Sequence, residues 1–259
     1  MAEPLPDWQK AVLERNRLPG NYLVSAQKWF NPVAGLIAEH QSGAGRPLIV
    51  AVNGSQGSGK STFCDYLAAL FAADYGLSCA VLSLDDFYLT APQRRQLALE
   101  VHPLFATRGV PGTQDMGLLG RTLDALLAGE PVSIPRFDKA ADDRAPESAW
   151  GLVEEPVQIV LLEGWCMGAM AHPVEEMVDT VTALEADEDA DGRWRDYVNG
   201  VLSEKFSPLY RRVDEWIMLQ APSFECVYQW RLEQEQKLAE RQSGEGIMSA
   251  VQILSLIHI

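Results

Sequence analysis

One stretch of the chain reads Gly54-Ser55-Gln56-Gly57-Ser58-Gly59-Lys60-Ser61 and fits the pattern G-x-x-x-x-G-K-[ST] of a phosphate-binding loop. An apolar, β-branched run at residues 48–52 precedes it and is typical of a buried parallel strand. Apolar residues at helical spacing follow it, namely Phe63, Leu67, Leu70 and Phe71. An accidental lysine beside a glycine-rich turn is the alternative, and the strand and helix on either side argue against it.

The order strand, glycine loop, helix suits the binding of a nucleotide phosphate. Glycines let successive backbone N–H groups turn inward, and the start of a helix favours an anion. We expect Lys60 to reach the β- and γ-phosphates of ATP and the Ser61 hydroxyl to ligate Mg²⁺. The residues predicted to bind the nucleotide in this stretch are Gly54, Ser55, Gln56, Gly57, Ser58, Gly59, Lys60, Ser61 and Thr62.

Composition limits the classes of partner. The chain has 259 residues and a formal net charge of −15, so its surface repels nucleic acid and anionic membranes, and neither is expected as a partner. The four cysteines form no zinc-binding pattern, and each lies in an apolar context, as free thiols do in a reducing compartment. No signal peptide opens the chain, so we expect a cytoplasmic protein. The oligomeric state cannot be inferred from the sequence.

Alternating apolar runs and helical patterns predict the fold class. Further strands are expected at residues 79–84, 132–135, 157–162 and 214–219, and a helix ending at Gly129 is expected between the first two of these. Ser223 is predicted to cap a long helix, and residues 185–191 are predicted to form a solvated acidic loop. Strands that alternate with helices predict an α/β fold with a doubly wound, mostly parallel sheet. In such sheets ligands bind at the carboxyl ends of the strands.

Carboxylates follow two of these strands at the point where ligands gather. Glu163 is the best-placed carboxylate to hold Mg²⁺ together with Ser61, although a structural carboxylate is the alternative. Asp85 follows the second strand, which lies next to the first in many such folds, and is predicted to accept the proton of an acceptor hydroxyl. Because adjacent side chains point to different sides, Asp86 is predicted to have a secondary role. Capping of a helix start is the alternative for both aspartates.

An acidic protein that handles anions is expected to carry arginines around its binding cleft. Four arginines border the predicted cleft, although any one of them alone fits a surface role: Arg108, Arg136, Arg144 and Arg231. Asp138 and Lys139 fit either the cleft or a solvated loop. His102, which precedes a proline, is expected to be structural, and the tryptophans are expected in the core.

Five motifs together resemble the D-glycerate 3-kinase family, which is grouped with uridine kinases, phosphoribulokinases and pantothenate kinases. They are the glycine stretch through Thr62, Ser83-Leu84-Asp85-Asp86-Phe87-Tyr88, Arg108-Gly109-Val110-Pro111-Gly112-Thr113-Gln114-Asp115, Pro135-Arg136-Phe137-Asp138-Lys139 and Leu162-Glu163-Gly164-Trp165. The resemblance covers about residues 20–250 in order. Family members commonly show His where this chain has Gln114.

The resemblance implies a P-loop kinase that uses ATP and Mg²⁺, with roles for particular residues. Lys60, Asp85 and Glu163 are implied as catalytic residues, Asp85 at the position of the catalytic aspartate and Glu163 at the Walker B acid. The segment around Arg231 is similar to a basic lid over ATP, and residues 136–144 are similar to a substrate loop. The substrate-binding residues so implied are Asp86, Tyr88, Arg108, Asp115, Arg136, Asp138 and Arg144.

The most favoured acceptor is a small, hydroxylated, anionic metabolite, namely D-glycerate. A nucleoside, pantothenate or a sugar remains an alternative acceptor, and an ATP-binding protein without turnover is a third alternative. For domains, we expect an N-terminal helical extension over residues 1–45 and a kinase domain over residues 46–253. Residues 254–259 match a translated sequencing adapter, so we expect a C-terminally truncated kinase domain.

Overall fold

The structure is a computed structural model that describes residues 5–239. The predicted adapter sequence at residues 254–259, and the last part of the predicted kinase domain, lie outside the described residues. Two helices, α1 (Asp7–Asn16) and α2 (Tyr22–Ala44), come first, separated by the predicted break at Pro19 and Gly20. Of the described helices, none is long and apolar enough to cross a lipid bilayer.

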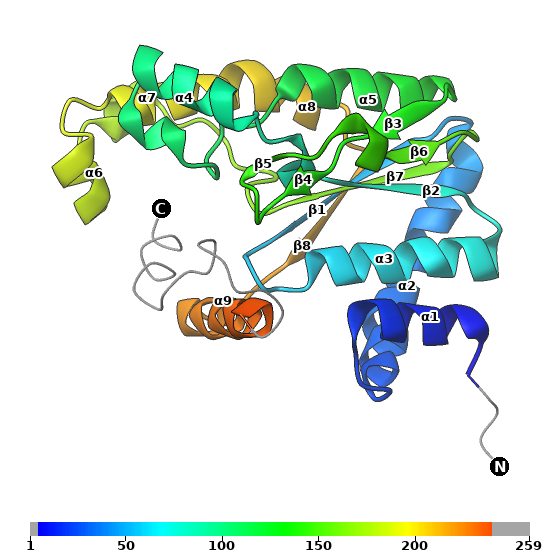
Figure 1. Ribbon diagram of the computed structural model, residues 1–259. Coiled ribbons are helices and arrows are strands. Elements are labelled where there is room, and N and C mark those ends of the chain that lie inside the picture. Colours follow the sequence, from blue (N-terminus) through cyan, green and yellow to red (C-terminus); the bar gives the residue numbers. More distant parts are fainter. Residues whose placement is uncertain (1–4, 240–259) are drawn as a thin grey trace.

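A four-stranded parallel sheet forms the centre of the molecule (Figure 1). Its strands are β1 (Leu48–Gly54), β2 (Cys79–Ser83), β7 (Ile159–Gly164) and β8 (Glu215–Leu219), in the order β2-β7-β1-β8. The predicted α/β class with a parallel sheet is therefore confirmed. The second strand, however, does not lie beside the first, as the sequence argument had it, because β7 is inserted between β2 and β1.

Burial along the strands explains their position in the sheet. Every residue of β7 is buried, and β1 is almost wholly buried, because both strands are covered on both faces. The edge strands β2 and β8 alternate between more and less exposed residues. On β8 this alternation leaves Trp216 and Met218 exposed.

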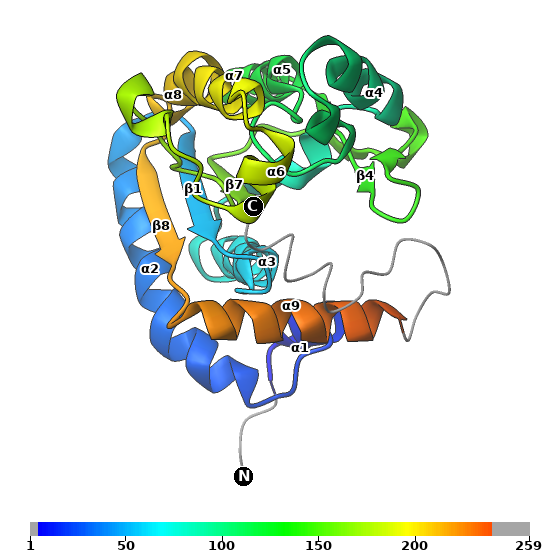
Figure 2. The same ribbon diagram turned by 90° about the vertical axis from the view of Figure 1, so that its left-hand side faces the viewer.

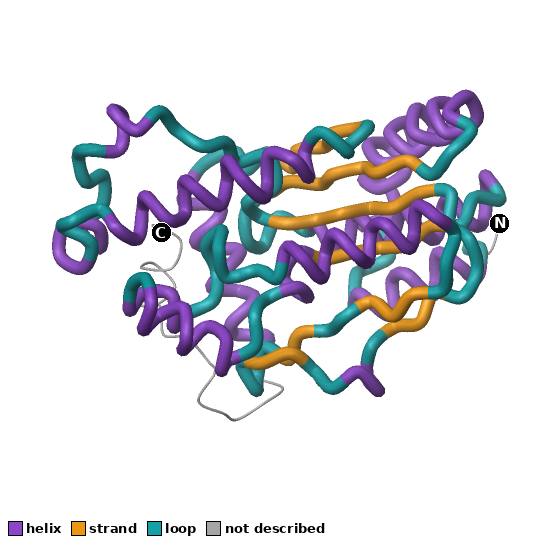
Figure 3. Tube along the Cα trace, turned by 90° about the horizontal axis from the view of Figure 1, so that it is seen from above, coloured by secondary structure: helices purple, strands orange, loops and turns teal. Residues whose placement is uncertain are grey.

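Two helical layers cover the sheet (Figures 1 and 3). On one face, Val50 and Val52 pack with α1, α2 and α3 (Lys60–Leu70), so the N-terminal helices share a core with the sheet. On the other face, Ile49 and Ala51 pack with α5 (Met116–Ala128) and α8 (Ser207–Tyr210). Alternate residues of β1 thus supply both cores, as strand geometry requires.

The other elements surround this framework. Two small antiparallel ribbons project from it, β3 with β6 and β4 with β5. The helix α5 ends at Gly129, as predicted, and the Ser223 hydroxyl accepts a hydrogen bond from Cys226 N at 3.3 Å at the start of α9, which confirms the predicted cap. The remaining bounds are α4 (Ala91–Glu100), β3 (Val132–Ile134), β4 (Phe137–Asp138), β5 (Asp143–Arg144), β6 (Gly151–Val153), α6 (Ala183–Glu188), α7 (Arg193–Val201) and α9 (Phe224–Ala239).

The predicted acidic loop at residues 185–191 is wrong in two respects. Its first part belongs to α6, whose start is closed by a capping box between Thr182 and Glu185. Asp189 is fully buried rather than solvated, with its carboxylate accepting hydrogen bonds from the backbone of Trp194 at 2.8 Å and Arg195 at 3.2 Å. The Arg195 side chain pairs with the same carboxylate at 3.1 Å. This segment therefore folds around a buried ion pair.

Candidate active site

All four strands of the main sheet are parallel, so their carboxyl ends lie at one edge. The glycine loop follows β1, Asp85 follows β2, and Glu163 is the penultimate residue of β7. In the sheet Glu163 pairs in register with Val52 of β1 and with Ser83 of β2. The fold therefore brings the predicted phosphate loop and both predicted carboxylates to one place.

Glycine is required at three points of this loop for different reasons. Gly57 and Gly59 have φ values of 79° and 88°, which side chains rarely adopt. A Cβ on Gly54 would lie 2.6 Å from Ser58 Oγ and 3.1 Å from the Cβ of Leu219. A Cβ on Gly57 would lie 2.6 Å from the Cβ of Trp230, because α9 packs directly against the loop (Figure 2).

The loop fits a phosphate group. Lys60 opens α3, and its Nζ donates to the carbonyl of Ser55 at 3.0 Å, which closes the loop around its own backbone. The hydroxyl oxygens of Ser55 and Ser58 are buried, and no hydrogen-bond partner is found for them within residues 5–239. Unpaired buried hydroxyls beside a helix N-terminus are suited to an anion that supplies the missing partners.

A divalent metal would be held where α3 meets the end of β7. Ser61 Oγ donates to Oε1 of Glu163 at 2.8 Å, and Glu163 is buried. A hydroxyl and a carboxylate at this separation are a donor set that Mg²⁺ accepts when phosphate oxygens and water complete its shell. A second cluster, His102 with Asp189 and Asp191, also has its ligand atoms within 4.8 Å of one another, but the Asp189 oxygens are already paired with Arg195 and backbone N–H groups.

Asp85 is paired with a lysine in the candidate site. Its Oδ2 accepts a hydrogen bond from Nζ of Lys139 at 2.8 Å. Burial raises the pKa of Asp85, but the Lys139 ammonium, with further contributions from Tyr88 and Lys60, outweighs burial and holds the pKa below its usual value. Asp85 is therefore ionised at neutral pH and able to accept a proton.

Lys60 shows that these charges lie close together. Burial lowers its pKa, while the carboxylates of Glu163 and Asp85 act in the opposite direction and Lys139 adds to the lowering. Burial also raises the pKa of Tyr88 well above its usual value, so its hydroxyl stays neutral beside Asp85. Two lysines and two carboxylates thus interact within one site.

A cavity of about 350 Å³ joins the phosphate loop to these residues. Nine of the predicted site residues line it: Gln56, Gly57, Lys60, Ser61, Asp85, Tyr88, Arg108, Glu163 and Arg231. Gly54, Ser55, Ser58, Gly59 and Thr62 form the rest of the loop and the first turn of α3 outside this lining. The cavity also has lining residues that the sequence argument missed, among them Thr107 and Leu184, and two tryptophans that it expected in the core, Trp165 and Trp194.

The other predicted substrate residues lie outside this lining and form hydrogen bonds and ion pairs within the protein. Arg136 pairs with Asp86 at 2.8 Å, and Asp86 also accepts from Phe137 N at 3.0 Å. Arg144 donates to the Tyr88 carbonyl at 2.9 Å and pairs with Asp115, whose carboxylate caps α5. Asp138 accepts from the backbone of Ala140 at 2.9 Å inside its own turn. Contact of these five residues with substrate stays a prediction.

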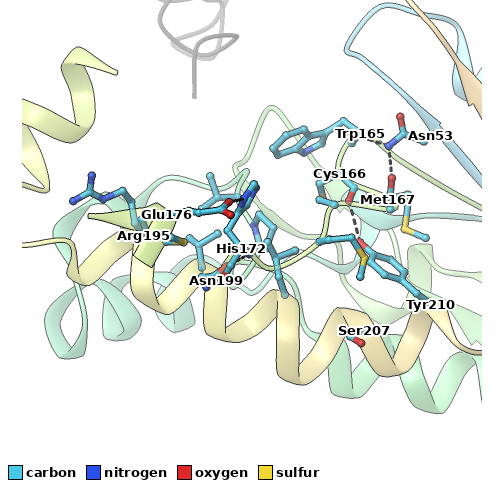
Figure 4. Close-up of a pocket in the computed structure, with 18 of the residues that line it drawn as sticks. Asn53, Trp165, Cys166, Met167, His172, Glu176, Arg195, Asn199, Ser207 and Tyr210 are labelled. Atoms are coloured by element: carbon cyan, nitrogen blue, oxygen red, sulfur yellow. Dashed lines mark hydrogen bonds and ion pairs between the residues drawn. The ribbon is translucent and has the colours of Figure 1, made fainter. Parts of the chain in front are cut away.

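A larger cavity of about 1270 Å³ adjoins this site (Figure 4). It is lined mainly by apolar side chains and contains neither Lys60 nor Asp85. Tyr210 donates to the Cys166 carbonyl at 3.1 Å on its wall, and Trp165 is shared with the smaller cavity. Because phosphoryl chemistry needs the charged groups, the smaller cavity is the candidate active site.

The chain is similar to known kinases in sequence and in structure. Residues 49–196 match the model of the phosphoribulokinase / uridine kinase family. The chain is 34% identical over 212 residues to the uncharacterized kinase mug58 of Schizosaccharomyces pombe, covering 76% of this chain and 73% of that protein. It is 32% identical over 213 residues to the chloroplastic D-glycerate 3-kinase of Arabidopsis thaliana, covering 78% of this chain but only 44% of that protein.

A solved structure gives the same result for the fold. The D-glycerate 3-kinase from Cryptococcus neoformans var. grubii superposes with a TM-score of 0.70 at 26% identity, covering 88% of this chain and 84% of that chain. The α/β fold with its parallel sheet is thus shared with a solved kinase structure. The chain belongs to the phosphoribulokinase / uridine kinase family of P-loop kinases.

Proposed function

We propose that the protein transfers the γ-phosphoryl group of ATP to a hydroxyl of D-glycerate, with Mg²⁺ as the metal. One observation carries the proposal: Lys60, Asp85 and Arg108 line a single cavity together with the Ser61–Glu163 pair. A cavity of about 350 Å³ suits a small acceptor next to a terminal phosphate. Two similar proteins, from Arabidopsis thaliana and Cryptococcus neoformans, are named D-glycerate 3-kinases, which favours D-glycerate among small acceptors.

Asp85 would act as the general base. The acceptor hydroxyl gives its proton to the Asp85 carboxylate as its oxygen forms a bond to the γ-phosphorus, and the bond from that phosphorus to the β–γ bridging oxygen breaks. The lowered pKa of Asp85 keeps the carboxylate ionised and ready for this step. Asp85 and Lys60 line the same cavity, so the acceptor and the terminal phosphate can meet there.

The positive groups would neutralise the charge that develops on the phosphate oxygens. Lys60 can leave the Ser55 carbonyl for the β- and γ-phosphates, while the loop N–H groups hold the phosphate chain. Mg²⁺, held by Ser61 and Glu163, supplies further charge neutralisation when bound. Arg231 lies on α9 next to the loop and lines the cavity, a position suited to closing over ATP.

Arg108 would select an acid as acceptor. Its side chain is partly buried, and it lines the cavity that also holds Asp85. A guanidinium binds a carboxylate through two parallel hydrogen bonds, a recognition that an uncharged nucleoside or sugar does not use. This is the feature that favours D-glycerate over the uncharged acceptors.

A panel of acceptors tests the proposal. The protein would be incubated with ATP, Mg²⁺ and, in turn, D-glycerate, L-glycerate, uridine, pantothenate and ribulose 5-phosphate, and ADP release would be followed. We expect D-glycerate to give the highest kcat/KM, with a phosphomonoester product detected by ³¹P NMR. Preferential turnover of another acceptor would reassign the substrate, and ATP binding without turnover of any acceptor would favour a non-catalytic role.

A further inference from the structure

The Asp142 carboxylate lies between two arginines beside the candidate active site. Its Oδ1 accepts from Nη1 of Arg108, and its Oδ2 accepts from Nη2 of Arg94 at 2.6 Å. Arg94 also reaches the Asp142 carbonyl at 2.8 Å. Asp142 lies between β4 and β5, so this turn is tied to both arginines.

Arg94 is a buried charge with an unusual number of fixed contacts. Only 1% of the residue is exposed, and its guanidinium also donates to the carbonyls of Leu89 at 2.7 Å and Ala106 at 3.4 Å. A buried guanidinium needs a counter-charge, and among the described residues Asp142 is the acid paired with it. Arg94 thereby joins the start of α4, the segment that leads to Arg108 and the β4–β5 turn.

Both guanidiniums also contact the same aromatic ring. The Cζ atoms of Arg94 and Arg108 lie 5.7 Å and 5.3 Å from the centroid of Phe137. Phe137 is itself fixed, because Asp86 accepts a hydrogen bond from its N–H and Tyr88 packs edge-on against its ring. The Arg108 guanidinium is therefore held at Nη1 by the Asp142 carboxylate and lies near the ring of Phe137.

Donors of Arg108 remain for a ligand. Within residues 5–239, no acceptor is bound to its Nε or Nη2, and the side chain lines the cavity that contains Asp85. Two arginines and one aspartate leave one net positive charge at this point. A single carboxylate would balance this positive charge and accept hydrogen bonds from the Nε and Nη2 groups of Arg108.

We propose that Arg94 and Asp142 are positioning residues that hold Arg108 in place to bind the carboxylate of an anionic acceptor. The acceptor's identity rests on the function proposed above, whereas the geometric relation between the three residues does not. Neither Arg94 nor Asp142 is expected to touch the acceptor. Both act through Arg108, so their loss should weaken binding of an acid without changing ATP binding.

Binding titrations can test this on the protein loaded with a non-hydrolysable ATP analogue. The ligands are D-glycerate and its uncharged amide, D-glyceramide. They differ mainly in the negative charge that Arg108 would bind. Asp142→Asn is the main variant, because Asp142 has a φ of 51° and Asn tolerates that conformation. We expect Asp142→Asn to weaken D-glycerate binding by roughly tenfold and to leave D-glyceramide and the ATP analogue within about twofold.

A double-mutant cycle with Arg108→Ala separates positioning from general damage. If Asp142 acts through Arg108, Asp142→Asn should cause no further loss of D-glycerate binding in the Arg108→Ala background. Asp124→Asn is the matched control, because it makes the same charge change at an exposed pair with Arg212 and does not line the cavity. It should bind both ligands as the unmodified protein does.

A further variant guards against misfolding. If Asp142→Asn leaves Arg94 without a counter-charge and lowers the melting temperature, Arg94→Met combined with Asp142→Asn should restore the melting temperature but not D-glycerate affinity. Unchanged D-glycerate affinity in Asp142→Asn, or an equal loss in the Arg108→Ala background, would overturn the inference. Binding of D-glycerate without turnover would reject the proposed function alone, whereas failure of the unmodified protein to bind it would reject both.

Discussion

Ser61 Oγ donates a hydrogen bond to Oε1 of Glu163 at 2.8 Å, across the gap between the first turn of α3 and the end of β7. The contact joins the start of α3 to the sheet, and these two side chains would hold a metal there. Ser61 is exposed, whereas Glu163 is buried, so the pair presents one accessible and one shielded ligand.

Glu163→Gln should reduce kcat by about 100-fold or more, because the amide keeps the volume and the hydrogen bond from Ser61 but loses the charge that holds Mg²⁺. The Mg²⁺ concentration for half-maximal activity should rise. Steady-state kinetics over a Mg²⁺ titration measures both quantities. Glu154→Gln, at an exposed position after β6, is the matched control and should behave as the unmodified protein. Full activity of Glu163→Gln at unchanged Mg²⁺ would remove Glu163 from the metal site.

Asp85→Asn should lower kcat by about a thousandfold, the effect of losing a general base. The affinity for ATP should stay nearly the same, because Asp85 follows β2 and lies outside the phosphate loop. Single-turnover rates and nucleotide titration separate the two effects. Turnover equal to that of the unmodified enzyme would show that another group takes the proton.

Lys139→Met should move the acidic limb of the kcat/KM profile to higher pH. The rate falls as pH drops through the pKa of Asp85, because only the ionised carboxylate accepts a proton. Burial raises the pKa of Asp85 and Lys139 lowers it, so the pKa of Asp85 should rise when Lys139 is replaced. The kcat/KM profile measured across the acidic range checks the direction of this shift.

The matched control for this profile is Lys205→Met, an exposed lysine that does not line the cavity. Its acidic limb should coincide with that of the unmodified enzyme. An acidic limb of Lys139→Met that also stays in place would mean that Lys139 does not set the ionisation of Asp85, and the base assignment would lose its electrostatic support.

The central strands and the phosphate loop could be predicted because their signals are local. A buried parallel strand such as β1 is a continuous apolar run, and the loop needs glycine at particular positions whatever the rest of the fold does. The order of strands is not local. No pattern within β2 or β7 indicates that β7 lies between β1 and β2, yet that order places Glu163 beside both.

The arginines show the same limit. Of the four expected around the cleft, Arg108 and Arg231 line the cavity, while Arg136 and Arg144 bind Asp86 and Asp115. Those pairs join positions 50 and 29 residues apart, so only the fold reveals which arginines pair with acids outside the cavity lining. The sequence gives only a weak indication that Lys139 belongs to the site, because it follows Asp138 in one of the motifs that resemble the family.

The buried Asp189 gives a prediction of stability that the acidic composition of its segment conceals. Asp189→Ala removes the nearer of the two acids that pair with Arg195, the other being Glu185 at 3.8 Å, and leaves two backbone N–H groups without their acceptor. A buried donor left without its acceptor costs about 1–3 kcal/mol, so thermal or urea unfolding should show a loss of at least this size.

Asp187→Ala, on the exposed side of α6, is the control with the same charge change and should lose less than about 0.5 kcal/mol. Combining Asp189→Asn with Arg195→Met should recover part of the loss, because no charge is then buried alone. Since Trp194 lines the candidate cavity, Asp189→Ala should also weaken acceptor binding wherever it remains folded. If Asp189→Ala unfolded like the Asp187 control, the segment would be held by its apolar contacts with Phe105 rather than by the ion pair.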